Sequence, residues 1–169
     1  MDQRYIIPFI KTTKNLFETM FQMNVEVGAP SVKAPNSAGH DVSGIIGLSG
    51  DVDGAVVLSF PMATAQRVVS LFTGVEISAE SHEDLSDAVG ELVNMVAGGA
   101  KAQFDGKSIS ISVPSVVIGA DHVVQQMRNA VAVIVPCQCD CGEFNIEVAF
   151  RGQTGEEVKA GVSTAGSSA

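Results

Sequence analysis

The sequence contains no tryptophan, a single tyrosine and few basic residues. Of its 169 residues, 10 are Lys or Arg and 19 are Asp or Glu, which gives a formal net charge of −9 at pH 7. Nucleic acids and anionic membrane surfaces are bound by clustered Lys and Arg, and single-stranded nucleic acids also by stacked aromatic rings. The composition therefore argues against a protein that binds nucleic acid or a membrane surface.

Long apolar runs are also missing, and cysteine is scarce. No stretch reaches the roughly 18 uncharged apolar residues of a membrane-spanning helix. The opening segment, MDQRYIIPFIKTTKN, lacks the basic region and unbroken apolar run of a signal peptide. Three cysteines cannot all pair within one chain, so we expect reduced thiols and a cytoplasmic protein.

Apolar residues are plentiful, but large ones are few near the C-terminus. They make up 46% of the chain, against 17% charged residues, which is enough for one domain with a core. From Gly152 onward the chain is mostly Gly, Ser, Ala and Thr. We therefore expect a single domain over residues 1–151 and a flexible tail over residues 152–169.

The first half of the chain predicts a helix followed by a hairpin. Apolar residues recur at three- and four-residue spacing over about residues 2–22, and the first helical turn is expected near Pro8. Two strand-like runs, 42–48 and 55–60, flank a loop rich in Gly and Asp, which predicts a β-hairpin turn rather than a calcium loop.

Two more helices and a set of strands follow the hairpin. One helix is predicted from Pro61 to Gly74, and a second from about His82 to Phe104 with a capping box of Ser81 and Asp84. Strands are then predicted at 109–113, 123–135 and 144–150. This order predicts an α+β fold, a largely antiparallel sheet with helices packed on one face.

The helix after Ser81 has two chemically different faces. At about 100° per residue, polar residues and one glycine gather on one side: Asp84, Asp87, Glu91, Asn94 and Gly98. The other side is apolar, with Leu85, Val89, Leu92 and Val96. A polar helix face is most often simply exposed to solvent. However, each mid-helix glycine costs about 1 kcal/mol relative to Ala, so Gly90, Gly98 and Gly99 indicate close approach by the fold or by a partner.

The pattern on this helix resembles a known family. Asp87-x-x-x-Glu91-x-x-Asn94, followed by Met-Val-Ala-Gly, resembles the active helix of the CheC/CheX/FliY phosphatases of bacterial chemotaxis. The segment 109–119, with Pro114, is similar to the strand and proline that follow the motif there, and the likeness extends upstream through residues 47–60. No second Glu-x-x-Asn is present, which matches the one-site CheX pattern rather than the two-site CheC pattern.

The resemblance implies a CheC-like fold and a function. It implies a phosphatase that stimulates hydrolysis of the aspartyl-phosphate on a CheY-like response regulator, with no covalent enzyme intermediate. In that family the receiver supplies Mg²⁺ and a lysine, so no cofactor is expected on this chain. Asn94 matches the amide that positions water, and Glu91 matches the carboxylate that pairs with the lysine. Asp87 and Gly98 are expected to contact the partner.

Two other functions stay open at this point. The helix could bind a receiver without catalysis, as an adaptor, or the chain could be a structural relative of flagellar switch domains. The pair Glu91 and Asn94 favours the enzyme, because a scaffold has no need of it.

The resemblance also implies a homodimer formed by strands joining into one sheet. The run 108–119 is β-branched, uncharged and contains Pro114, as expected for an edge strand or a bent one that needs a partner. The alternative is that this run lies inside the monomer's own sheet.

The remaining motifs have simpler interpretations. Cys137, Cys139 and Cys141 are expected in a loop between two strands. They could share a soft metal, but zinc sites favour wider spacing and a fourth ligand, so inert thiols are the favoured interpretation. The isolated histidines are expected at the surface or at helix ends: His40, His82 and His122.

Overall fold

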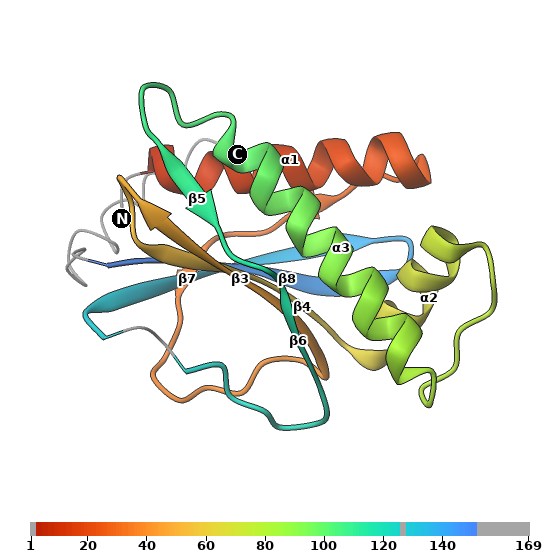
Figure 1. Cartoon of the computed structure of the whole chain (residues 1–169). Helices are drawn as coiled ribbons and strands as arrows, with labels where there is room; N and C mark the ends of the chain where they lie inside the picture. Colours follow the sequence, from red (N-terminus) through yellow and green to blue (C-terminus); the bar gives the residue numbers. More distant parts are fainter. Residues whose placement is uncertain (1–2, 126–127, 152–169) are drawn as a thin grey trace.

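The computed structural model describes residues 3–125 and 128–151, and these form three helices and one eight-stranded sheet (Figure 1). The elements are α1 (Gln3–Phe21), β1 (Glu26–Val27), β2 (Ser31–Val32), β3 (Val42–Gly50), β4 (Gly54–Phe60), α2 (Met62–Thr73), α3 (His82–Lys101), β5 (Ile109–Ile111), β6 (Ser115–Ile118), β7 (Ala130–Cys139) and β8 (Gly142–Arg151). Every strand pairing among them is antiparallel, and the strand order is β1-β7-β8-β4-β3-β5, with β2 also on β7 and β6 also on β3. The predicted α+β class is confirmed.

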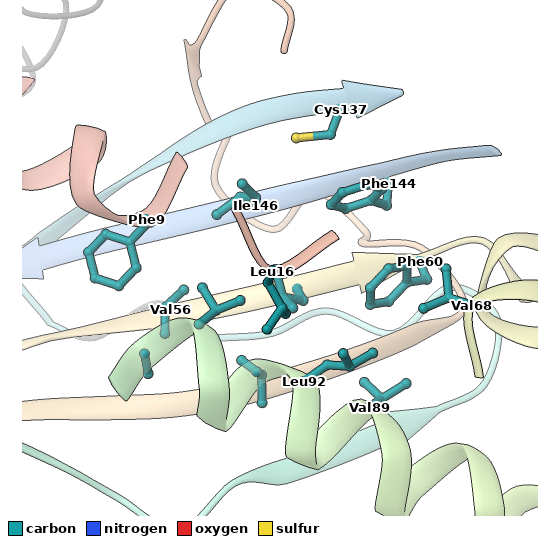
Figure 2. Packing of buried hydrophobic residues seen from close by; sticks show 14 of the residues in the cluster. Phe9, Leu16, Val56, Phe60, Val68, Val89, Leu92, Cys137, Phe144 and Ile146 are labelled. Atoms are coloured by element: carbon teal, nitrogen blue, oxygen red, sulfur yellow. The ribbon is translucent and has the colours of Figure 1, made fainter. Parts of the chain in front are cut away.

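The core fills the space between the helices and one face of the sheet. Figure 2 shows side chains of all three helices and of the central strands meeting there. The ring of Phe144 stacks on Phe17 of α1 and on Phe60 of β4, with centroid distances of 5.1 and 5.3 Å. Because all three rings are fully buried, they tie the first helix to the middle of the sheet.

The first helix begins earlier than predicted. We expected its first turn near Pro8, but α1 already begins at Gln3 and Pro8 lies inside it. The ring of Pro8 is buried, together with Ile6 and Phe9. Packing of this turn therefore compensates for the loss of the backbone hydrogen bond that a proline cannot donate.

The hairpin and the next helix follow the prediction closely. The strands β3 and β4 pair from Val42↔Phe60 to Leu48↔Gly54. A Cβ atom at Gly54 would lie 2.2 Å from the carbonyl oxygen of Ala149, so only glycine fits there. The helix α2 ends at Thr73 and is capped by Gly74, as predicted, whose φ of 75° is left-handed and suits glycine.

The start of α3 differs from the predicted capping box. Ser81 makes no side-chain cap hydrogen bond. Its hydroxyl instead accepts a hydrogen bond from the backbone N–H of Ser78 at 3.3 Å and lies 3.1 Å from that residue's hydroxyl. Glu83 and Asp84 still place negative charge in the first turn, where the helix dipole favours it.

Three expectations about the second half of the chain were wrong. The strand predicted over 109–113 ends at Ile111, and Val113 is exposed in the connection 112–114. The strand β7 begins at Ala130 rather than 123. It also continues through Pro136, so two of the cysteines lie on a strand and not in a loop. The expected tail, 152–169, lies outside the described residues.

Among the described residues, no helix covers the second face of the sheet, which we call the face without helices. The connections 33–41 and 119–125 run on that side (Figure 1). Within residues 3–125 and 128–151, no helix is long and apolar enough to cross a membrane.

Candidate functional site

Helix α3 is anchored through its apolar face, as the periodicity predicted. Leu85, Val89, Leu92 and Val96 are each at most 1% exposed. The helix lies directly on β3 at Gly44, where an added Cβ would be 3.0 Å from Val89 Cγ1 and 3.2 Å from its carbonyl oxygen. This close contact fixes the helix, so the opposite face is presented in a defined orientation.

The opposite face carries the residues singled out in the sequence. Asp87 and Glu91 are exposed, and Asn94 and Gly98 are half-buried. Along a helix, residues three or four positions apart are neighbours, so these four form one continuous strip. Within the part of the chain that the structure describes, the side chains of Asp87, Glu91 and Asn94 have no hydrogen bond or ion pair. They are therefore free to bind something outside the chain.

The three glycines of α3 have different surroundings. A Cβ at Gly90 would make ordinary contacts with Val116 at 3.5 Å and Pro114 at 3.7 Å, and one at Gly99 would clash with Thr12 of α1 at 2.5 Å. Nothing lies within 4 Å of a Cβ at Gly98. Contact with α1 therefore explains the glycine at position 99. At Gly98 the helix surface stays uncovered, one turn after Asn94.

The strip is an exposed helix face and not a pocket. Four cavities in the described residues, of about 690, 430, 550 and 310 Å³, are lined by other side chains. None of them includes Asp87, Glu91 or Asn94. Small ligands bind in concave sites that bury most of their surface, so this arrangement suits docking against another macromolecule.

The three cysteines are buried, free thiols. Burial, with a smaller contribution from nearby Cys139, raises the pKa of Cys137 to about 12 and that of Cys141 to about 11. These two thiols are therefore protonated at neutral pH and are poor nucleophiles. Among the described residues, no group of three or more His, Cys, Asp or Glu side chains could hold a metal ion.

His122 and the hairpin loop have structural contacts. His122 Nε2 lies 2.8 Å from Ser43 Oγ, and its Nδ1 lies 2.7 Å from the carbonyl oxygen of Gly119. Since Gly44 faces α3, neighbouring Ser43 and His122 lie on the other face of the sheet. In the hairpin loop, Asp51 Oδ2 accepts a hydrogen bond from the backbone N–H of Ser108 at 2.6 Å, as expected for a structural turn.

Sequence reasoning missed a buried ion pair. Lys33 Nζ lies 2.7 Å from Glu147 Oε2, and the two side chains are only 3% and 6% exposed. Glu147 lies between Ile146 and Val148, which belong to the core, so it points to the face without helices. The partners are 114 residues apart, and no local pattern could have linked them.

Comparison with known proteins gives consistent matches. Residues 42–138 match the family model "Chemotaxis phosphatase CheX". The CheY-P phosphatase CheX of Thermotoga maritima is 31% identical over 123 residues, which cover 72% of this chain and 79% of that protein.

Solved structures of the same family superpose on most of the chain. The crystal structure of a chemotaxis protein CheX from Desulfovibrio desulfuricans matches with a TM-score of 0.80 and 31% identity, covering 87% of this chain and 99% of that one. The CheX of a CheX–CheY–BeF₃–Mg²⁺ complex from Borrelia burgdorferi matches with a TM-score of 0.75 and 26% identity, covering 87% and 97%.

Proposed function

This chain belongs to the CheX family of chemotaxis phosphatases, and we propose that it hydrolyses the aspartyl-phosphate of a CheY-like response regulator through Glu91 and Asn94. The observation that carries the site assignment is the exposed strip on α3. There Glu91 and Asn94 are neighbours, lack partners among the described residues and lie on a helix that is fixed from behind. The strip lies within the matched range 42–138.

Asn94 is proposed to orient the attacking water. Hydrolysis transfers the phosphoryl group from the receiver's aspartate to water, which breaks the bond between phosphorus and the carboxylate oxygen and releases inorganic phosphate. The water must approach in line with that bond. A neutral amide can hold it by hydrogen bonds without placing negative charge beside the phosphoryl group. Since Asn94 is half-buried on a fixed helix, the backbone that carries its amide is held in place before the partner arrives.

Glu91 is proposed to dock the receiver. A carboxylate beside a phosphoryl group would be repelled, whereas one turn away it can pair with the receiver's active-site lysine. Asp87 lies one turn before Glu91, and open Gly98 lies one turn after Asn94, so both are assigned to the contact surface. The Mg²⁺ is assigned to the receiver, which is supported by the Borrelia complex containing CheY, BeF₃ and Mg²⁺.

The function is tested by phosphate release from a purified CheY-like receiver that has been phosphorylated with a small phosphodonor. The chain should accelerate release in catalytic amounts. Binding without acceleration would favour the adaptor. Neither binding nor acceleration, with each of several receivers, would favour a structural role like that of flagellar switch domains.

Glu91→Ala should weaken receiver binding strongly. Losing one half of a desolvated interfacial ion pair costs about 2–5 kcal/mol, which is about 30-fold to several thousand-fold in Kd. Titration with the BeF₃-activated receiver measures this directly. Glu143→Ala is the matched control, because Glu143 is an exposed carboxylate on β8, away from α3. If Glu91→Ala and the wild type bind the receiver with equal affinity, the docking role of Glu91 is contradicted.

We also propose a homodimer in which the edge formed by β5 and β6 pairs across a two-fold axis. Both strands pair only with β3 among the described residues, and residues 108–119 carry no charge, which leaves an edge that favours pairing. Light scattering at low micromolar concentration should give a mass near twice 17.5 kDa. Val117→Lys, at an exposed position of β6, should shift the protein towards monomer. A monomeric wild type would contradict the proposal.

The cytoplasm is the proposed compartment. The three cysteines are free in the structure, and such thiols persist where the cell keeps them reduced. The receiver that carries the phosphoryl group would have to share that compartment.

A further inference from the structure

We propose that the cavity of about 430 Å³ on the face without helices binds a small, unbranched apolar molecule that ends in an uncharged hydroxyl or amide group. Sites for small ligands are concave and mostly apolar, with volumes of about 300–1,000 Å³ and a few converging polar groups. The cavity lies on the opposite side of the sheet from the α3 strip, so the proposal does not depend on the proposed function.

The floor of the cavity is a row of small residues that crosses four strands. Ala132 of β7 pairs with Ala149 of β8. Ala149 pairs in turn with Ala55 of β4, and Ala55 with Gly47 of β3. Directly paired residues point to the same face of a sheet, and all four line the cavity. With strands about 4.8 Å apart, this row is about 14 Å long. A long, narrow floor suits an unbranched chain.

A row of larger side chains forms one wall of the cavity. Ile45 pairs with Val57, and Val57 pairs with Glu147. Each of these residues is two positions along its strand from a floor residue, so it points to the same face. Val124, from the connection after β6, also lines the cavity, and this connection runs along the face without helices (Figure 1). The lining is therefore mainly apolar, and burial of an apolar chain there is favourable.

The ion pair of Lys33 and Glu147 supplies polar groups with unused hydrogen-bonding capacity. Both residues line the cavity, and their side chains are only 3% and 6% exposed. An ammonium group has three donors, and a carboxylate has two acceptor oxygens. Within the described residues, the 2.7 Å bond between Lys33 Nζ and Glu147 Oε2 is the only side-chain hydrogen bond that either residue makes. Further N–H groups of Lys33 and the second oxygen of Glu147 are therefore available to a ligand.

The same pair selects against a charged ligand. It is neutral as a whole, so a ligand carboxylate would be repelled by Glu147 and a ligand ammonium by Lys33. A hydroxyl or a primary amide both donates and accepts hydrogen bonds, so it can bind both side chains at once. Polar groups that are buried gain most from such additional partners.

The proposed homodimer leaves the polar end of the cavity free. Glu147 lies on β8, and the strand order places β4 and β3 between β8 and the edge formed by β5 and β6. Pairing at that edge extends the sheet and does not cover its face over β8. Ile111 and Ser112, which line the cavity at the edge, have no part in the recognition that is proposed.

The test is titration of the full chain with 1-octanol, octanoate and octylammonium, which share one alkyl chain and differ in the charge of the end group. Backbone amide NMR shifts report both the affinity and the place of binding. We expect a Kd for 1-octanol on the order of 0.1–1 mM, as for a good ligand of this size. Both charged probes should bind at least tenfold more weakly. The shifts should gather around Ala55 and Ala149 and be absent from α3.

Two variants locate the binding. Ala55→Leu fills the floor and should weaken 1-octanol binding at least tenfold. The matched control is Ala79→Leu, at another half-buried alanine, between α2 and α3, and it should bind like the wild type. Glu147→Gln removes the negative charge beside Lys33, so octanoate should then bind more tightly than 1-octanol.

The outcomes separate the parts of the proposal. No binding of 1-octanol by the wild type, or equal binding by folded Ala55→Leu, would overturn the site. Octanoate or octylammonium binding to the wild type as tightly as 1-octanol would overturn the assigned end group. Circular dichroism checks that each variant folds. If Ala55→Leu does not fold, the position of the NMR shifts in the wild type decides the site. None of these results changes the phosphatase assignment, which is tested by phosphate release.

Discussion

Asn94→Ala should remove most of the phosphatase activity and leave the fold intact. Loss of one hydrogen-bonding group that acts in the transition state costs about 2–4 kcal/mol, so the single-turnover rate should fall by about 30-fold to 1000-fold. The fold should survive, because the Asn94 side chain is half-buried and has no hydrogen bond to a described residue. Phosphate release under saturating phosphatase isolates this step from receiver binding.

One further variant and one binding measurement sharpen the assignment of Asn94. Asn94→Asp keeps the size of the side chain but replaces the amide by a carboxylate, which adds charge beside the phosphoryl group and should be as damaging as alanine. Receiver affinity should change little in Asn94→Ala, in contrast to Glu91→Ala. If folded Asn94→Ala releases phosphate at a rate within twofold of wild type, Asn94 does not position the water.

The strip on α3 could be predicted because helical periodicity is local information. Leu85 and Leu92 are fully buried, while Asp87 and Glu91 are exposed, as their spacing indicated. The hairpin β3–β4 and the end of α2 at Gly74 were predictable for the same reason, since short loops and glycine caps act within a few residues. Periodicity alone could not show that the side chains of the strip lack partners among the described residues.

The features that sequence reasoning missed depend on contacts between distant segments. A single strand was predicted over 109–113, but β5 ends at Ile111, where Ser112 is held by Gly47, 65 residues away. The strand β7 continues through Pro136 because β8 pairs with it along its whole length, from Ala130↔Arg151 to Cys139↔Gly142. Local turn preferences at Pro136 were therefore overridden by sheet pairing.

Lys33→Ala should be among the most destabilising single changes in the protein. It would leave the carboxylate of Glu147 buried and without its 2.7 Å partner, and breaking such a pair on one side costs about 3–5 kcal/mol. In urea unfolding, this loss of stability should appear as a lower urea concentration at the midpoint. Phosphate release per folded molecule should be unchanged, because Glu147 lies on the face of the sheet without helices, away from α3.

Removing both charges should have a much smaller effect than removing one. The attraction between two buried charges roughly offsets the free energy that it costs to remove both from water. The double variant Lys33→Met with Glu147→Leu is therefore expected to be about as stable as the wild type, or more stable. Lys33 and Glu147 border a cavity of about 430 Å³ among small and apolar residues such as Ala132 and Ala149, which gives the new side chains apolar neighbours. A coupling energy of several kcal/mol in the double-mutant cycle follows. If the losses in free energy of unfolding of the two single variants instead add up in the double variant, the two side chains stabilise the protein separately, through their packing.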